Sequence, residues 1–294
     1  MRLRSLLFVP GDRPDRMAKA CGSGADALIL DLEDAVAPAA KPDARAAVAA
    51  FLREPREGRP ALFVRINPLD GKLAEEDLAA VLPARPDGLV LPKAEGARTL
   101  AALDARLSGD IAILPIATET PAAICQRGSY AGVTPRLAGL TWGAEDLPAA
   151  IGAATSREAD GGYTAPYQMA RSLTLFGAHA AGVPAIETVY PDFRDLDGLA
   201  AYAARGRRDG FTGMMAIHPA QVAVINAAFS PNAQEIAAAQ AIVDLFAANP
   251  GAGALQLNGR MVDAPHLKAA RALLSLAADR GAGTLGSPPP GERP

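Results

Sequence analysis

Short apolar runs alternate with Ala/Leu-rich segments of helical spacing along most of the chain. The runs are continuous hydrophobics that end abruptly in a polar residue, which is typical of buried parallel strands. Eight such runs predict strands at Leu6–Val9, Ala27–Leu30, Leu62–Ile66, Gly88–Leu91, Ile111–Ile116, Leu137–Thr141, Ala185–Thr188 and Met214–Ile217. Helical spacing predicts helices at Pro42–Leu52, Ala74–Leu82, Gly96–Leu107, Tyr167–Ala181 and Leu196–Asp209.

Eight repeats of a strand followed by a helix predict an α/β fold, a (β/α)8 TIM barrel. A doubly wound open sheet has the same alternation and is the alternative fold. No G-x-G-x-x-G motif follows any of the strands, so the barrel is preferred.

The pattern changes after the eighth strand. Pro219–Phe229 and Asn232–Asn249 predict helices, and Leu255–Asp263 predicts a small hairpin with Asn-Gly at its turn. Pro265–Arg280 predicts a final helix. We therefore expect a barrel domain over residues 1–229, a helical and hairpin module over 230–280, and a disordered Gly/Pro-rich tail over 281–294.

Composition narrows the class of protein. The 294 residues carry a net charge of only −3, which gives no electrostatic case for binding nucleic acid. No apolar run approaches the length needed to cross a bilayer, so no membrane role is expected. The two cysteines, Cys21 and Cys125, form no CxxC motif, and we interpret both as reduced core residues. A cytoplasmic protein is expected.

Two successive strands end in acids. Glu119 follows the fifth strand, and Glu145-Asp146 follows the sixth. Because parallel strands deliver their carboxyl ends to one rim, these carboxylates would share a site suited to a hard cation such as Mg2+. The alternative is that Glu145 or Asp146 only caps the next helix.

The other strands also end in charged or polar residues: Arg13, Asp31, Glu33, Asp34, Arg65, Lys93, Glu187 and His218. Arg65 is either a structural ion-pair partner or faces Glu119 and Asp146 across the rim. For Asp31 we favour an ordinary acidic loop. His218 is interpreted as a helix-start residue, and the three histidines have no zinc-site spacing.

Seven motifs follow one another along the chain: Leu6-Leu7-Phe8-Val9-Pro10-Gly11, Asp31-Leu32-Glu33-Asp34-Ala35-Val36, Val64-Arg65-Ile66-Asn67, Leu91-Pro92-Lys93, Glu119-Thr120, Gly143-Ala144-Glu145-Asp146-Leu147 and Ile217-His218-Pro219-Ala220-Gln221. Together they resemble the citrate lyase β-subunit-like family of CoA-ester lyases, within the HpcH/HpaI aldolase group. The resemblance spans about Arg4 to about Arg280. Two departures are Met214, where the family often has Lys, and Glu187, where it often has Asp.

The resemblance implies a Mg2+-dependent barrel that is usually trimeric. It implies Glu119 and Asp146 as metal ligands and Arg65 as the group that binds the substrate carboxylate or thioester oxygen. Backbone amides around Glu145 and Asp146 would hold the keto-acid carboxylate. Asp263, on the hairpin, matches an acid that longer members place over a neighbouring subunit's site. Further candidates complete the set, with Asp34 as catalytic and Arg13, Lys93 and Leu147 as substrate-binding.

The implied reaction is a reversible Claisen-type cleavage of a malyl-CoA or citramalyl-CoA type thioester to acetyl-CoA and a small 2-keto acid. The expected partners are thus an acyl-CoA thioester, a keto acid and, for a homotrimer, further copies of the chain. The alternatives are the citryl-acyl-carrier-protein lyase β-subunit of a citrate lyase complex, a malyl-CoA thioesterase, and a ligand-binding barrel without catalysis.

Overall fold

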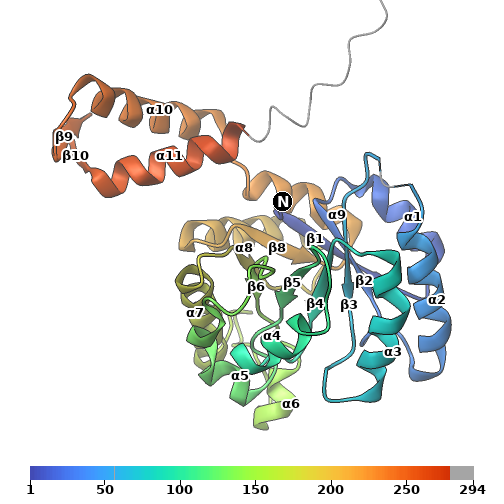
Figure 1. The fold of residues 1–294 in the computed structure, drawn as a ribbon. Helices are drawn as coiled ribbons and strands as arrows, with labels where there is room; N and C mark the ends of the chain where they lie inside the picture. The colour runs from blue at the N-terminus through green and yellow to red at the C-terminus, as the bar shows by residue number, and fades with distance from the viewer. Residues whose placement is uncertain (56, 279–294) are drawn as a thin grey trace, which may run out of the picture. The chain divides into compact units, whose positions relative to one another are not determined.

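The computed structural model describes residues 1–55 and 57–278. Eight strands pair in parallel in the order β5-β4-β3-β2-β1-β8-β7-β6. They are β1 Ser5–Pro10, β2 Ala27–Asp31, β3 Ala61–Arg65, β4 Gly88–Leu91, β5 Ala112–Pro115, β6 Leu140–Thr141, β7 Ala185–Glu187 and β8 Gly213–Ala216. Two isolated parallel bridges, Ile113 to Leu137 and Ile116 to Thr141, join β5 to the segment of β6. The sheet is a nearly closed barrel, which confirms the predicted fold (Figure 1).

Helices lie between the strands and surround them (Figure 1). They are α1 Pro14–Ala20, α2 Lys41–Leu52, α3 Lys72–Val81, α4 Ala97–Asp104, α5 Pro121–Cys125, α6 Leu147–Ile151, α7 Ala165–Ala180, α8 Leu196–Asp209 and α9 Pro219–Ala228. Helices α1, α5 and α6 have five to seven residues, too few to show helical spacing, and the sequence pattern did not predict them.

Side chains alternate between two cores along each strand. Ile29, Phe63 and Ile186 belong to the cluster inside the barrel, whereas Leu28, Leu30, Leu62 and Val64 pack in the cluster that includes the helices. The period of two residues then continues to the strand ends. Asp31 and Arg65, two positions after Ile29 and Phe63, face the mouth of the barrel and stand directly opposite each other in the β2–β3 register.

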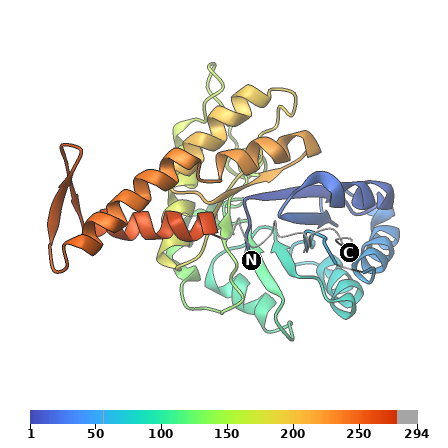
Figure 2. The ribbon, with the colours of Figure 1, turned by 90° about the horizontal axis from the view of Figure 1, so that it is seen from above.

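A second compact unit begins at Ser230. It contains α10 Ala233–Ala248, the antiparallel strands β9 Ala254–Leu257 and β10 Arg260–Asp263, and α11 Ala264–Ala278. Asn258 and Gly259 form the turn with φ of 50° and 77°, the left-handed conformation that an Asn-Gly hairpin turn requires. Within this unit α10 and α11 lie side by side and the hairpin stands at one end (Figure 2). The predicted disordered tail, 281–294, lies outside the described residues.

Two smaller observations concern the surface. Cys125 is exposed and Cys21 is only half-buried, so their interpretation as core residues was wrong, although both are free thiols. Among the helices of the described ranges, none is long and apolar enough to cross a membrane.

Candidate active site

Asp31 and Arg65 form a bidentate ion pair at the mouth of the barrel. Arg65 Nε donates to Asp31 Oδ1 at 2.7 Å, and Nη2 donates to Oδ2 at 2.6 Å. The Asp31 carboxylate is buried and also accepts the backbone N–H groups of Glu33 and Ala35. The prediction of an ordinary acidic loop for Asp31 was therefore wrong. Strand β2 continues one residue beyond its apolar run, which places this acid inside the barrel.

Arg65 presents its remaining edge to the site. Its Nη1 lies 2.9 Å from Glu33 Oε2 and 4.0 Å from Asp34 Oδ2, and its guanidinium carbon lies 4.9 Å from the centre of the Phe8 ring. Burial lowers the pKa of Arg65, but the hydrogen bonds to Asp31 and the charges of Asp31, Glu33 and Glu119 outweigh burial and raise it. Arg65 is thus a fixed positive charge aimed at the rim.

Lys93 connects three parts of the rim. It follows β4 in a left-handed conformation, with φ of 48°. Its Nζ lies 2.9 Å from Glu33 Oε1 and 3.9 Å from Asp146 Oδ1. Burial raises the pKa of Glu33, against the lowering effects of Arg65 and Lys93. The backbone N–H of Lys93 donates to Glu119 Oε2 at 2.5 Å.

Glu119 is the most perturbed acid at the rim. Its side chain is buried, and burial, with the charges of Glu33 and Asp146, raises its pKa to about 8 despite the N–H of Lys93. Thr118 holds the loop at Gly143 next to Glu119, because the Thr118 hydroxyl donates to the Gly143 carbonyl and accepts the Gly143 N–H. A side chain at residue 143 would lie 3.3 Å from Glu119 Cγ, so glycine leaves room for the carboxylate.

Asp146 stands at the first position before α6, yet its side chain makes no capping hydrogen bond. The alternative that Asp146 only caps a helix is therefore not realised. Its carboxylate is about one-third exposed and interacts electrostatically with Glu119. Glu145 is exposed, and Leu147 is buried beneath the loop. In the part of the chain that the structure describes, the amide N–H groups of Glu145 and Asp146 donate to no other group.

These groups fit a magnesium ion better than a zinc ion. Among the residues that the structure describes, no three His, Cys, Asp or Glu side chains cluster as metal ligands. The rim instead offers two oxygen donors, Glu119 and Asp146, and Mg2+ commonly takes one or two carboxylates and keeps several waters. Burial is the main cause of the raised pKa of Glu119, and the charges of Glu33 and Asp146 add to it; a cation bound there would favour the ionised carboxylate.

Two strand-end residues lie outside this cluster. Glu187 is buried on the outer face of β7, where it accepts from Trp142 Nε1 at 2.5 Å, from Arg171 Nε at 2.7 Å and from the Tyr202 hydroxyl at 3.0 Å. His218 accepts the Ala220 N–H and caps α9, as its interpretation as a helix-start residue predicted.

Arg13 lines a separate pocket of about 660 Å³ between β1, α1 and the segment Ile217–Pro219. Arg16 and Lys19 add two more positive charges, and Arg13 is paired with Asp15 at 3.0 Å. Phe8 lines the same pocket, and its ring also contacts Arg65. Phe8 thus borders both the basic pocket and, through Arg65, the carboxylate cluster.

Asp263 belongs to the second unit. Its Oδ1 lies 2.5 Å from His266 Nδ1, and the hydrogen bond with His266 lowers the pKa of Asp263. The barrel thus brings together Arg65, Lys93, Glu119 and Asp146, with Asp34 at the edge, whereas Asp263 is held on the hairpin. Sequence reasoning missed Thr118, and it missed the involvement of Asp31 in the cluster.

Comparison with known proteins gives consistent results. The family model for HpcH/HpaI aldolase/citrate lyase matches residues 4–219. A citrate lyase subunit beta-like protein of Mycobacterium tuberculosis is 36% identical over 93% of this chain and 95% of its own. A (3S)-malyl-CoA thioesterase of Cereibacter sphaeroides is 34% identical over 93% and 94%. The crystal structure of CitE from Mycobacterium tuberculosis with magnesium, acetoacetate and coenzyme A is 34% identical, with a TM-score of 0.81, over 94% of this chain and 98% of that one.

Proposed function

Because the chain belongs to the HpcH/HpaI aldolase/citrate lyase family, we propose that it is a Mg2+-dependent carbon–carbon lyase. Its substrate would be a 3-hydroxy-3-carboxyacyl-CoA thioester of the malyl-CoA or citramalyl-CoA type, and its products acetyl-CoA and a small 2-keto acid. The observation that carries this proposal is that Phe8, which lines a basic pocket, also contacts Arg65 of a carboxylate cluster. The similar CitE structure holds magnesium, acetoacetate and coenzyme A together.

The basic pocket suits the phosphates of coenzyme A. Arg13, Arg16 and Lys19 supply the charge-assisted donors that phosphate oxygens accept. The apolar wall that includes Phe8 then directs the thioester toward Arg65. Lys93 lies instead among Glu33, Glu119 and Asp146, and we assign it to the carboxylate end of the substrate.

Glu119 and Asp146 are the proposed ligands of the metal. When bound there, Mg2+ supplies Lewis-acid polarisation of the substrate hydroxyl and carboxylate oxygens. The free amide N–H groups of Glu145 and Asp146, with the start of α6 at Leu147, would receive the keto-acid carboxylate.

The protein's own groups then handle charge and protons. Loss of the hydroxyl proton and cleavage of the bond between C2 and C3 leave an electron pair on the thioester as an enolate. Arg65, held in place by Asp31, stabilises that negative charge. Asp34 is exposed at the rim, 4.0 Å from Arg65, and is our candidate for accepting the hydroxyl proton. In cleavage the α-carbon of the enolate takes a proton from Asp263, and in the reverse reaction the Asp263 carboxylate removes that proton.

One assay separates this function from its alternatives. Purified protein with Mg2+ is given malyl-CoA, citramalyl-CoA, methylmalyl-CoA or an acyl-carrier-protein thioester of citrate. Free CoA is followed together with the acyl-CoA product, which is acetyl-CoA, or propionyl-CoA from methylmalyl-CoA. Acetyl-CoA without free CoA supports the lyase, and free CoA supports a thioesterase, the activity of one relative. Turnover only of an acyl-carrier-protein thioester would indicate a citrate lyase subunit. No turnover of any substrate would indicate a binding barrel.

Replacing Arg65 by Lys tests the role of its guanidinium. Lys cannot reproduce the two-pronged contact with Asp31 or a planar contact with a thioester oxygen. We expect kcat/KM to fall about a hundredfold or more, as for loss of one oxyanion donor. Steady-state kinetics measure this, and circular dichroism checks the fold. Unchanged catalytic efficiency would leave Arg65 as a structural ion-pair partner.

The pH dependence of Mg2+ binding tests the metal site. Burial raises the pKa of Glu119 to about 8, so this carboxyl is mostly protonated at pH 7 and must release its proton when the cation binds. We expect affinity for Mg2+ to rise with pH up to about 8 and then level off. Calorimetry at pH 7 in buffers of different ionisation enthalpy should detect the release of about one proton for each Mg2+ ion bound. Affinity independent of pH would exclude Glu119 as a ligand.

A further inference from the structure

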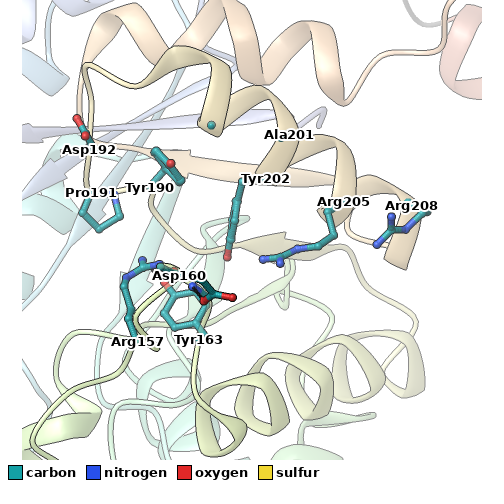
Figure 3. A pocket seen from close by; sticks show the side chains of 13 residues that line it. Arg157, Asp160, Tyr163, Tyr190, Pro191, Asp192, Ala201, Tyr202, Arg205 and Arg208 are labelled. Carbon is teal, nitrogen blue, oxygen red and sulfur yellow. Dashed lines mark hydrogen bonds between the residues drawn. The ribbon is translucent and has the colours of Figure 1, made fainter.

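Another pocket, of about 740 Å³, has no part in the proposed lyase reaction. It lies between the loop that precedes α7, the loop that follows β7, and one side of α8 (Figure 3). Its charged and aromatic lining is Arg157, Arg205, Arg208, Asp160, Asp192, Tyr163, Tyr190 and Tyr202. A volume of this size is in the range of small-molecule sites.

Two arginines in this pocket have no acidic partner in the residues that the structure covers. Arg205 makes no hydrogen bond or ion pair there, and its guanidinium carbon lies 4.9 Å from the centre of the Tyr202 ring. Arg157 lies 4.2 Å over Tyr163 and donates only to neutral oxygens, the Gly161 carbonyl and the Tyr163 hydroxyl. Figure 3 shows these two side chains entering the pocket from opposite sides, with Tyr202 between them. Their stacking on aromatic rings orients the guanidinium groups and leaves donors of Arg205 available.

The carboxylates of the two acids in the pocket accept backbone N–H groups within their own turns. Asp160 Oδ1 accepts the N–H of Gly162 at 2.9 Å, and Asp192 Oδ1 accepts the N–H groups of Arg194 and Asp195. Neither carboxylate pairs with a lining arginine in the contacts found for 1–55 and 57–278. Burial raises the pKa of Tyr163 to about 12, so its phenol stays neutral. The lining thus combines an excess of cationic donors with neutral hydroxyls.

We propose that this pocket binds a small organic polyanion, a phosphate ester or a polycarboxylate, through Arg157 and Arg205. The guanidinium fork matches both anions bidentately, and two forks facing one space favour a ligand with more than one charge. Arg208, about three-quarters exposed and 3.4 Å from Asp209, extends the positive surface at the pocket's edge. The pocket shares no lining residue with the carboxylate cluster or with the basic pocket beside α1.

The pocket is connected to the loop that carries Asp146. Tyr163 packs edge-on against Trp142 with ring centres 5.1 Å apart, and Tyr202 and Trp142 both donate to Glu187. Trp142 immediately precedes Gly143. It is also the one tryptophan of the chain, so any change in tryptophan fluorescence on titration comes from this position.

Titration of full-length protein in magnesium-free buffer with pyrophosphate, and separately with citrate, tests the proposal. Calorimetry and Trp142 fluorescence give the affinity, and the two ligands separate the phosphate and carboxylate arms. We expect saturable binding of at least one of them. Arg205→Gln should weaken it about tenfold, the loss of one charge-assisted contact. Arg205→Lys, which keeps the charge, should give a smaller loss, and Arg98→Gln, an exposed charge-matched control, should give none.

A double variant, Arg16→Gln with Lys19→Gln, separates this pocket from the one beside α1 and should leave the affinity unchanged. The proposal is overturned if neither anion binds, if Arg205→Gln binds as tightly as the parent, or if the double variant abolishes binding. It is also overturned if Arg205→Gln shifts the oligomeric mass in light scattering without added anion, because the pocket would then hold another copy of the chain.

Discussion

Replacing Glu119 by Gln should remove activity while leaving the fold intact. The proposed metal ligand loses its charge, and loss of metal-assisted polarisation should lower kcat by about a thousandfold or more, equivalent to about 4 kcal/mol of transition-state stabilisation. The Gln carbonyl can still accept the N–H of Lys93, as Glu119 Oε2 does. Steady-state kinetics over a range of Mg2+ concentrations measure the loss.

The stability of the same variant has a definite sign. The pKa of Glu119 in the folded protein, about 8, lies above its usual value of 4.5, so ionisation costs folding stability as pH rises between these values. Gln resembles the protonated acid and removes that cost. Without Mg2+, the Tm of Glu119→Gln at pH 8 should therefore equal or exceed that of the parent.

Glu187→Gln is a matched control, because both glutamates are buried. Glu187 is paired with the largely buried Arg171 at 2.7 Å, so its neutral replacement leaves that cation with Asp209, at 2.8 Å, as its remaining acidic partner. We expect a lower Tm for Glu187→Gln and unaltered Mg2+ binding per folded molecule. Full Mg2+-dependent turnover by Glu119→Gln would refute the assignment of Glu119 as a ligand.

The barrel could be predicted from the sequence because the same strand-then-helix pattern occurs eight times along the chain. Each strand carries a continuous apolar run and each connection has room for a helix, so an error of one or two residues in any strand leaves the topology unchanged. The ends of the strands are less secure. Strand β6 retains two residues of a predicted five, because Leu137 joins β5 only through an isolated bridge.

Side chains alternate between the two faces of a strand, so the face on which the last residue lies decides whether its charge points into the site. Ile29 and Phe63 point into the barrel, so Asp31 and Arg65 do too, whereas Ile186 points inward and Glu187 must point outward. Because both faces of each strand are apolar, the sequence gives no signal that separates the two cases. Asp31 and Glu187 therefore have similar sequence surroundings, although Asp31 points into the barrel and Glu187 points outward.

Glu119 and Asp146 lie beyond the last paired residues of their strands, so the alternation of side chains along a strand does not predict where their carboxylates point. Hydrogen bonds from Thr118 to Gly143 and from Lys93 to Glu119 do so in the structure. Their candidacy as a pair came from two successive strands ending in acids and from the family resemblance. Contacts between loops distant in sequence cannot be read from either strand alone.

Asp263→Asn should abolish cleavage while leaving Mg2+ and keto-acid binding in place. Asp263 ends β10 opposite Ala254, at the end of the hairpin away from the Asn258-Gly259 turn. It is paired with His266, whose hydrogen bond lowers the pKa of Asp263. It is therefore ionised at neutral pH and suited to take the thioester α-proton in the condensation direction, with cleavage as the microscopic reverse. Removing a positioned acid/base should reduce kcat by about a hundredfold to ten-thousandfold. Calorimetry with Mg2+ and pyruvate should show parent-like affinities.

Mixing Asp263→Asn with Glu119→Gln subunits tests whether the hairpin serves a neighbouring barrel. If the protein is the homotrimer that the family resemblance implies, each site would combine a barrel from one subunit with Asp263 from the next. In a ring of equal proportions, about one site in four then pairs an intact barrel with an intact Asp263. The mixture should recover up to about a quarter of parental activity, although each variant alone is inactive. Native mass spectrometry confirms that subunits have exchanged. Exchange without recovery would show that Asp263 acts on its own barrel or supports structure only, because no subunit in the mixture carries both intact groups.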